Sequence, residues 1–329
     1  MKSWILTEPY RLELVEMPKP NPGPHEALVR MRHIGLCGSD LEIYRGHRDP
    51  EFLTTPVRAG HEASGVVEAV GSEVQGLKPG DRVVARGIWG CFSEYIAGPM
   101  VSPPSPRAMP TLQLVKLPGD FPEEYGPFIE VLPKIVRTGE RIGVTSGSDV
   151  VIVGQGVCGL LLTQVVRMQN PHRLVVLDLH EHKLDLARRY GATHTLDASA
   201  GALSDLVRSV LPDGADIVIV AHLAGSGVPE AIELLKWNGQ LILWGCLGKT
   251  EVDFYRLHAR GGDILGTRMR NLEEDIRYCR KAVEYVADGV IDLSRLITHR
   301  FDLDHVPEAF AAKDEGGPGM VAVMVDSAD

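Results

Sequence analysis

The most constraining feature of the sequence is an alternation of short apolar runs with helical patterns over residues 146–268. The clearest apolar runs are VVIVG, RLVVLDL, DIVIVA and QLILWG, and the clearest helical patterns are GLLLTQVVRMQ, EHKLDLARRYG and VPEAIELLKWNG. Short buried strands that alternate with amphipathic helices are typical of βαβ units around a parallel sheet. We therefore predict a doubly wound α/β domain over residues 146–268.

A glycine-rich loop connects the first strand of this domain to its first helix. The run VVIVG leads into GQGVCG at residues 154–159, and a helical pattern follows at once. In this context the first glycine permits a tight turn, the second lets the backbone approach a pyrophosphate, and the third allows close helix–strand packing. The helix N-terminus offers unpaired N–H groups to phosphates. The alternative is a turn whose glycines serve packing alone. The loop predicts a dinucleotide site at Gly154, Gly156, Val157, Cys158 and Gly159.

The second strand ends with a carboxylate, Asp178. It follows Gly154 at close to the spacing of about 20 residues at which dinucleotide-binding folds place an acidic residue. A carboxylate there accepts hydrogen bonds from the adenosine ribose hydroxyls and repels a 2′-phosphate, so we expect NAD rather than NADP. Lys183, on the next helix, either reaches the ribose or a phosphate or is a solvated helix residue.

The rest of the chain has a different pattern. Period-two runs separated by Gly and Pro predict a mostly antiparallel β domain, which we assign to residues 1–145; examples are HEALVRMRHI, ASGVVEAVG and DRVVARG. Residues 269–329 contain one long helical pattern, NLEEDIRYCRKAVEYVADG, and end in a strand-like run, MVAVMV. The chain is therefore expected to combine a parallel α/β domain with a β domain.

Charge and apolar patterning argue against several classes of protein. The net charge is -10 and the basic residues are scattered, so nucleic acid and anionic membrane surfaces are not expected partners. No apolar run approaches the roughly 20 residues of a membrane span. The N-terminus has no signal-peptide pattern, and a cytoplasmic location is expected. The five cysteines include no CxxC pair, which argues against a disulfide framework or a four-cysteine zinc knuckle.

Side chains of the types that bind zinc occur in three segments. Cys37 lies in HIGLCGSD, His61 and Glu62 lie in RAGHEASG, and Glu130 lies in PFIEVLPK. Thiolate, imidazole and carboxylate groups are the ligands that zinc accepts. Taken singly, each residue is weak evidence, because a lone cysteine is more often a buried apolar residue. The surrounding motifs carry the argument further.

These motifs resemble those of one family, the zinc-dependent medium-chain dehydrogenases/reductases. The resemblance covers nearly the whole chain and rests on GLCGSD, GHEASGVVEAVGSEV, GLKPGDRVV, the glycine loop and the closing segment LITHRFDLDHVPEAFA. It implies a Rossmann domain and a mostly β, GroES-like catalytic domain to which residues 269–329 return. It also implies an active site in the cleft between the domains, and a homodimer or homotetramer.

The resemblance assigns the metal ligands. Cys37 and His61 match the family's zinc-binding cysteine and histidine, and Glu62 matches an acidic residue that is a ligand or a near neighbour. Glu130 matches a position that is cysteine in some members and glutamate in many polyol and sugar dehydrogenases. Many members also carry a four-cysteine lobe for a structural zinc. The corresponding segment here is only ARGIWGC, so one zinc per chain is expected.

The resemblance also assigns residues around the metal. Asp40 resembles the carboxylate that orients the zinc-binding histidine, and Ser39 matches the hydroxyl that passes the substrate's proton outward. Phe92 resembles an aromatic residue of the substrate pocket. Glu42 replaces a histidine of the outer proton path and resembles an acidic residue of some sugar dehydrogenases. The polar segment 44–49 is either close to the pocket mouth or a solvated surface loop.

Together these assignments predict an NAD-dependent zinc dehydrogenase. Zinc would lower the pKa of a substrate hydroxyl, Ser39 would receive the proton, and hydride would pass to the nicotinamide. Carboxylate ligands and a polar pocket mouth favour a small polar substrate: a secondary alcohol, polyol, sugar or cyclitol. The alternatives are a zinc-free quinone or enone reductase of the same superfamily and a non-catalytic NAD-binding protein on the same fold.

Overall fold

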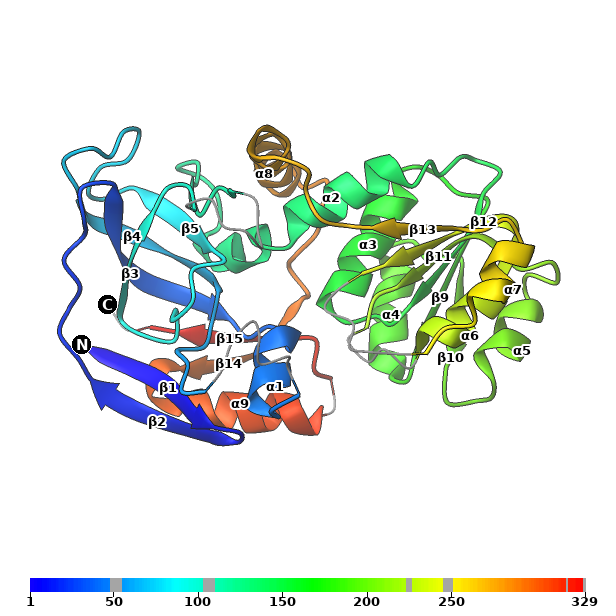
Figure 1. The fold of residues 1–329 in the computed structure, drawn as a ribbon, viewed down its shortest axis with the longest axis horizontal. Helices are drawn as coiled ribbons and strands as arrows, with labels where there is room; N and C mark the ends of the chain where they lie inside the picture. The colour runs from blue at the N-terminus through cyan, green and yellow to red at the C-terminus, as the bar shows by residue number, and fades with distance from the viewer. Residues whose placement is uncertain (48–54, 103–109, 223–226, 245–250, 318, 328–329) are drawn as a thin grey trace. The chain divides into compact units, whose positions relative to one another are not determined.

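The computed structural model describes residues 1–47, 55–102, 110–222, 227–244, 251–317 and 319–327. The chain forms two compact units, both of which appear in Figure 1. The first unit comprises Met1–Pro133 and Met269–Asp329, and the second comprises Lys134–Arg268. The first unit is therefore built from two separated parts of the chain.

A mostly antiparallel sheet forms the centre of the first unit. Its order is β14-β15-β3-β4-β5-β7, and β6 also pairs with β3; among the described residues, β14 and β15 alone pair in parallel. A separate two-stranded sheet contains β1 (Lys2–Glu8) and β2 (Arg11–Glu16). The strands of the larger sheet are β3 (Glu26–Gly35), β4 (Glu62–Val70), β5 (Arg82–Arg86), β6 (Tyr95–Pro99), β7 (Leu114–Lys116), β14 (Ile297–Asp302) and β15 (Ala322–Asp326).

The C-terminal segment completes this sheet, because β15 pairs antiparallel with β3. Asn271 is the N-cap of helix α8, and its side chain accepts a hydrogen bond from the Glu274 N–H. Gly316, which directly follows helix α9, caps its C-terminus with a positive φ of 67°. The described helices of this unit are α1 (Gly38–Tyr44), α8 (Leu272–Ala287), α9 (Val306–Glu315) and the 3₁₀ helices η1 (Glu123–Ile129) and η2 (Leu303–His305).

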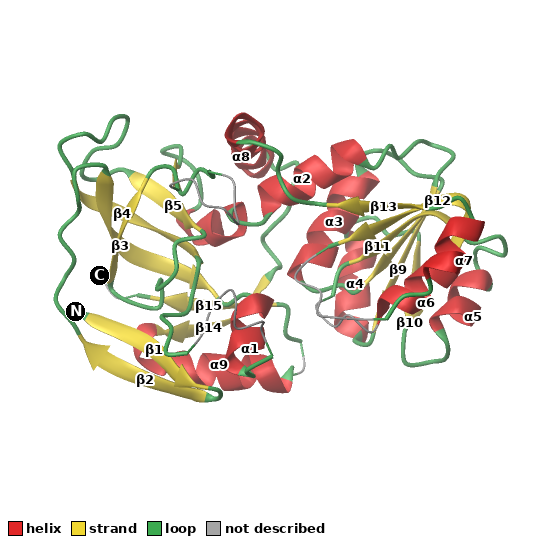
Figure 2. Cartoon of the chain, in the orientation of Figure 1, coloured by secondary structure: helices red, strands yellow, loops and turns green. Residues whose placement is uncertain are grey.

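The second unit has the predicted doubly wound architecture. Its described strands are parallel and lie in the order β10-β9-β8-β11-β12-β13, which reverses direction beside β8. Figure 2 shows helices flanking the strands of this unit. The strands are β8 (Asp149–Val153), β9 (Arg173–Asp178), β10 (His194–Asp197), β11 (Ala215–Val220), β12 (Leu235–Leu243) and β13 (Asp263–Gly266). The helices are α2 (Leu132–Arg141), α3 (Val157–Arg167), α4 (Glu181–Arg189), α5 (Leu203–Arg208), α6 (Gly227–Glu233) and α7 (Phe254–Ala259).

The N-terminal part of the first compact unit ends at Pro133, ahead of the boundary at residue 145 that the sequence led us to expect. The side chain of Gln169, just beyond α3, donates to the Gly139 carbonyl at 2.9 Å. Arg141, at the end of α2, donates to the Gly266 carbonyl at 3.2 Å. These bonds attach α2 to the second unit, which the apolar pattern of the strands alone did not indicate.

None of the helices in the described part of the chain is long and apolar enough to cross a membrane.

Candidate functional site

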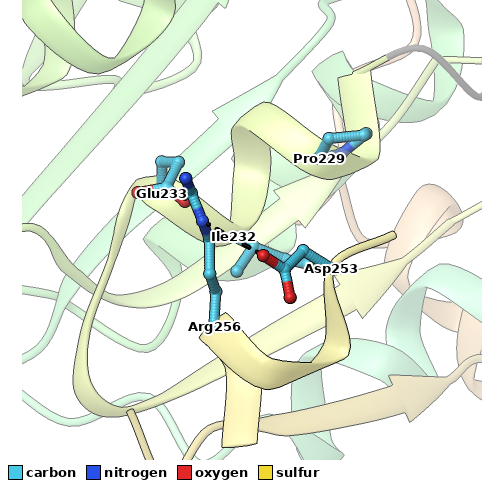
Figure 3. Close-up of a pocket in the computed structure, with 5 residues that line it drawn as sticks. All are labelled: Pro229, Ile232, Glu233, Asp253 and Arg256. Carbon is cyan, nitrogen blue, oxygen red and sulfur yellow. Dashed lines mark hydrogen bonds and ion pairs between the residues drawn. The ribbon is translucent and has the colours of Figure 1, made fainter. Parts of the chain in front are cut away.

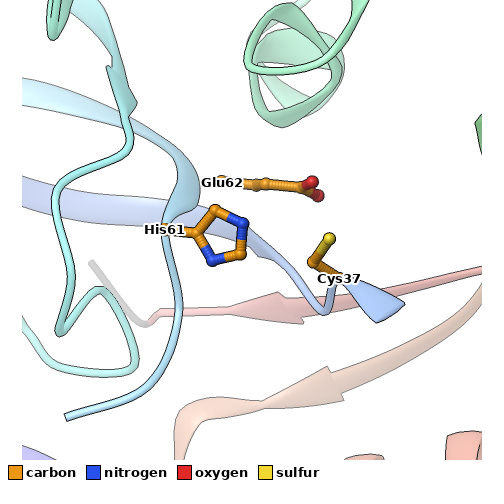
Figure 4. Close-up of side chains that lie close together, drawn as sticks. All are labelled: Cys37, His61 and Glu62. Carbon is orange, nitrogen blue, oxygen red and sulfur yellow. The ribbon is translucent and has the colours of Figure 1, made fainter. Parts of the chain in front are cut away.

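Three of the predicted ligands, Cys37, His61 and Glu62, lie together in the first unit. Strands β3 and β4 pair so that Gly35, at the end of β3, is opposite Glu62, at the start of β4. Cys37 follows β3 closely and His61 immediately precedes β4. The possible ligand atoms of the three side chains all lie within 4.8 Å of one another. Figure 4 shows the Cys37 sulfur, the Glu62 carboxylate and a ring nitrogen of His61 turned toward a common space.

The carboxylate of Asp40 holds the two ligand-bearing segments together. Asp40 is fully buried on α1. Its Oδ2 accepts the Cys37 N–H and its Oδ1 accepts the Gly60 N–H, both at 3.0 Å. The same Oδ1 lies 3.5 Å from Nδ1 of His61. Asp40 thus fixes the backbone beside both Cys37 and His61, in the way that residues behind metal ligands orient them.

Two further side chains contact the imidazole of His61. The Ser39 hydroxyl lies 3.4 Å from Nε2. The ring of Trp89 lies 4.4 Å from the imidazole, centroid to centroid, with 35° between the planes. Sequence reasoning missed Trp89. It belongs to the short ARGIWGC segment, where an aromatic residue in place of a cysteine-rich lobe was the available indication.

Burial and mutual repulsion shift the pKa values of the cluster. Burial, and then the Glu62 carboxylate, raise the pKa of the Cys37 thiol. Burial also raises the pKa of Glu62, and the Glu130 carboxylate adds to this rise while His61 opposes it. Burial by itself lowers the pKa of His61, but Asp40 and Cys37 raise it well above its ordinary value. The cluster therefore gathers anionic donors where a cation is needed to stabilise their charged forms.

Glu130 lies at the C-terminal end of η1, and its side chain is buried. It is not a member of the group whose ligand atoms lie within 4.8 Å of one another. The charge of Glu130 nevertheless affects the pKa values of two neighbouring residues, Glu62 and Arg86. Burial lowers the pKa of Arg86, but Cys279, Asp275 and Glu130 raise it above its ordinary value. The role of Glu130 as a metal ligand stays a prediction.

Glu42 and the polar segment after it are engaged within their own unit. The Glu42 carboxylate lies 3.4 Å from Nη1 of Arg45 and 3.9 Å from Nδ1 of His47. Arg45 also donates to Asp314 of α9 at 2.6 Å, and Tyr44 is buried. Of the segment 44–49, residues 48 and 49 lie outside the described residues. Its predicted place at a pocket mouth stays a prediction.

Phe92 is packed into the hydrophobic core of the first unit and is 1% exposed. Its ring meets that of Phe310 edge-on at 5.4 Å between centroids. A Cβ on Gly60 would lie 2.9 Å from the Phe92 ring, so Phe92 packs directly against the residue that precedes His61. Phe92 therefore supports a ligand-bearing segment, and its predicted part in lining the substrate pocket stays a prediction.

The glycine loop of the second unit has the geometry that its sequence predicts. Gly154 has a positive φ of 94°. A Cβ on Gly159 would lie 1.9 Å from the Gly154 carbonyl oxygen, so only glycine fits there. A Cβ on Gly156 would meet no atom within 4 Å, which leaves open space for a close backbone approach. Val157 and Cys158 begin helix α3, whose N-terminus adjoins this space.

Asp178, at the end of β9, stands beside this loop. Its Oδ2 accepts the Gln155 N–H at 2.7 Å and its Oδ1 accepts the His180 N–H at 3.0 Å. The Lys183 ammonium lies 3.9 Å from Oδ1. The sheet therefore brings the predicted ribose-binding carboxylate next to the predicted phosphate-binding loop, with Lys183 in contact.

The residues present fit the two groups that such sites hold. Cysteine, histidine and carboxylate donors match zinc, and Nδ1 of His61 lies 3.5 Å from the Asp40 carboxylate, the kind of partner that orients a metal-binding histidine. The open space at Gly156 and the adjoining helix N-terminus match a pyrophosphate.

A hollow of about 240 Å³ on the second unit does not involve these residues. Its lining is Pro229, Ile232, Glu233, Asp253 and Arg256, as Figure 3 shows. Arg256 is paired there with Glu233 and lies 3.4 Å from Asp253. The charges of this hollow are therefore satisfied by one another.

Comparison with known proteins places both units in described families. Residues 23–101 match the alcohol dehydrogenase GroES-like domain, and residues 157–287 match the zinc-binding dehydrogenase domain. The chain is 32% identical to sorbitol dehydrogenase of Pongo abelii over 95% of this chain and 93% of the relative. It is 28% identical to L-threonine 3-dehydrogenase of Shewanella frigidimarina, over 95% of this chain and 96% of that relative. A solved candidate zinc-binding dehydrogenase from Sinorhizobium meliloti, bound to NADP, superposes with a TM-score of 0.81 at 27% identity, over 99% of this chain and 98% of that one.

The fold, the cluster of metal-binding side chains and the comparisons all indicate the same family. The chain belongs to the zinc-type medium-chain dehydrogenase/reductase family, and it is an oxidoreductase.

Proposed function

We propose that this dehydrogenase transfers a hydride from a secondary hydroxyl of a polyol, sugar or cyclitol to NAD. The cluster of Cys37, His61 and Glu62 carries the proposal, because its donor set suits one catalytic zinc. The relatives named sorbitol dehydrogenase and L-threonine 3-dehydrogenase support a small polar substrate that carries a hydroxyl group.

Each side chain around the cluster has a definable task. Bound zinc would supply a Lewis acid that lowers the pKa of the substrate hydroxyl. We assign to Ser39, whose hydroxyl lies 3.4 Å from Nε2 of His61, the task of taking up the released proton and passing it on. Asp40 would hold the Cys37 and His61 backbone segments at a fixed separation. Glu130 is the candidate for a further ligand.

Asp178 is the basis for proposing NAD. It lies beside the glycine loop, where its charge would repel a 2′-phosphate. The Sinorhizobium relative is bound to NADP, so the preference requires a direct test. We expect Asp178→Ser to lower the ratio of kcat/KM with NAD to kcat/KM with NADP at least tenfold. An unaltered ratio would contradict the role given to this carboxylate.

We further propose that the protein is a homodimer or homotetramer joined through the nucleotide-binding units. Among the described strands β13 is the last of its sheet, and Ile264 on it is 40% exposed. An unpaired edge of this kind can pair with a second copy. Light scattering after size exclusion should show an oligomer for the wild type and a smaller species for Ile264→Lys.

The decisive experiment combines metal analysis with a substrate panel. Purified protein is analysed for zinc and then assayed with polyols, aldoses, cyclitols and secondary alcohols, with NAD and with NADP, at the reduced-nicotinamide absorbance band. We expect about one zinc per chain and the highest kcat/KM with a polar secondary alcohol and NAD. Cys37→Ser should lose both zinc and activity. Cys91→Ala, a change at a buried cysteine outside the cluster, serves as the matched control and should keep both.

Two outcomes would overturn the proposal. Less than about half a zinc per chain with full activity on an enone or quinone would favour a zinc-free reductase. Zinc and NAD binding without turnover of any hydroxyl compound would favour a non-catalytic role.

A further inference from the structure

Arg86 is a buried cation beside the candidate metal cluster, and the proposed reaction does not use it. It ends β5 and lies directly opposite Glu62 on β4. Residues directly opposite each other in an antiparallel pair project from the same face of the sheet, with Cβ atoms about 5 Å apart. Arg86 is only 4% exposed. A buried cation next to an anionic donor set calls for an explanation.

Helix α8 holds the end of this side chain. Nη1 and Nη2 of Arg86 donate to the two carboxylate oxygens of Asp275 at 3.1 and 3.2 Å. Nη1 also donates to the Leu112 carbonyl at 2.8 Å, and Asp275 accepts the Leu112 N–H at 2.8 Å. Strand β5 and helix α8, both labelled in Figure 1, are thereby joined through a buried ion pair.

One donor of Arg86 is left over. Its Nε–H is buried and has no hydrogen-bond partner among the described residues. A buried donor without an acceptor is costly, so such groups are commonly satisfied when a functional partner is in place. Because Asp275 and Leu112 engage the two terminal nitrogens, the direction of the Nε–H is fixed.

Glu130 is the carboxylate placed to use this donor. It ends η1, and η1 packs against both β5 and α8, the elements that carry Arg86 and Asp275. Its side chain is buried in this unit. The electrostatic effect of Glu130 on Arg86 agrees with this placement.

We propose that Arg86 is a positioning residue that orients the Glu130 carboxylate for metal binding. With zinc bound, one oxygen of Glu130 would accept the Arg86 Nε–H, and the other would thereby be directed to the cluster of Cys37, His61 and Glu62. Asp275 keeps the guanidinium in place, so helix α8 contributes to the metal centre without supplying a ligand. The inference rests on the proposed function, because it presupposes a zinc held by the cluster.

A double-mutant cycle on the full-length protein tests whether Arg86 acts through Glu130. Zinc affinity is measured by competition with a chromophoric chelator for the wild type, Arg86→Lys, Glu130→Gln and the double variant. Arg86→Lys keeps the charge beside Asp275 but removes the planar donor group. We expect it to weaken zinc binding by about 10- to 100-fold, the usual cost of losing a partner of a ligand. In the Glu130→Gln background, Arg86→Lys should weaken zinc binding less than threefold.

Arg82→Lys is the matched control. Arg82 lies on the same strand and face as Arg86 and also serves structure, donating to the carbonyls of Phe121, Pro118 and Gly119. We expect its zinc affinity to stay within threefold of the wild type. The absorption spectrum of the Co²⁺-loaded protein gives a readout that general destabilisation does not move. Arg86→Lys and Glu130→Gln should alter its visible bands alike, and Arg82→Lys should leave them unchanged.

The outcomes separate the inference from the proposed function. A wild type that binds no zinc overturns both. A wild type that binds zinc, together with an Arg86→Lys variant of equal affinity, overturns the inference alone. The inference alone is also overturned if Arg86→Lys lowers zinc affinity equally in the wild-type and Glu130→Gln backgrounds, because Arg86 then does not act through Glu130. If Arg86→Lys does not fold, Arg86→Met combined with Asp275→Asn removes the buried pair together and takes its place in the cycle.

Discussion

The carboxylate of Asp40 offers the sharpest test of how this metal centre is built. It is fully buried and accepts two backbone N–H groups, from Cys37 and Gly60, one on each oxygen at 3.0 Å. Asparagine has nearly the same shape but only one oxygen. In Asp40→Asn, one of the two N–H donors therefore faces an amide NH₂ group and loses its acceptor.

The magnitude follows from the bond that is lost. A hydrogen bond to a charged acceptor contributes about 1.5 to 3 kcal/mol, and a buried donor left unpaired adds to the cost. We therefore expect local stability at the Cys37 and Gly60 amides to fall by about 2.5 kcal/mol. A change of this size corresponds to roughly 70-fold faster hydrogen exchange where exchange reports local opening. Zinc affinity should fall about 10- to 100-fold, since His61 loses its oriented neighbour.

Hydrogen exchange on the metal-free protein, followed by mass spectrometry of peptides that contain Cys37 and Gly60, measures the first effect. Chelator competition measures the second. Asp253→Asn is the control, because Asp253 also accepts a backbone N–H, from Tyr255, but is exposed at the start of α7. It should leave the metal centre unchanged. Wild-type exchange at both peptides together with zinc affinity within threefold of the wild type would refute the reasoning.

Further predictions concern the second unit and the metal. Gly159→Ala should abolish NAD binding, measured by calorimetry, while zinc content stays unchanged, because the added Cβ would lie 1.9 Å from the Gly154 carbonyl oxygen. Asp149→Asn should lower the melting temperature at neutral pH. Although burial raises the pKa of Asp149, the hydrogen bonds and charge of Arg173 outweigh it and hold the pKa below its usual range. The stabilisation is therefore present above about pH 4 and is lost as the pH falls through the folded-state pKa, so the variant and the wild type should converge in acid. An equal difference in melting temperature between variant and wild type at pH 3 and at pH 7 would contradict this pH dependence. Dialysis against a strong chelator should remove activity but leave NAD binding intact, and added zinc should restore activity.

Spacing along the chain was enough to predict most of the fold. The strands of the second unit are continuous apolar runs because helices cover both faces of a parallel sheet, and this made residues 146–268 recognisable. The glycine loop was predictable for a similar reason, since a positive φ at Gly154 and a close approach at Gly159 exclude other residues locally. The contacts within the fold divide the chain at Pro133 rather than at residue 145, because α2 is joined to the second unit through side-chain contacts that no local pattern records.

Resemblance also directed attention to Cys37, His61 and Glu62, which the structure brings within 4.8 Å of one another. Other features of the centre depend on contacts that no local pattern encodes. The ring of Trp89 lies 4.4 Å from that of His61 because the segment after β5 returns to the start of β4, where the Gly87 and Gly90 N–H groups donate to the His61 and Gly60 carbonyls.

The sequence by itself determined the features that depend on one residue or one short motif. These are the βαβ pattern, the glycine loop, and the residue types that suit zinc and ribose. What only the tertiary structure decided is which distant groups meet. Arg86 and Asp275 are separated by 189 positions in the chain and share a buried ion pair. The physical reason is that such a contact depends on strand register and helix packing, which are settled by the whole fold and leave no periodic trace along the chain.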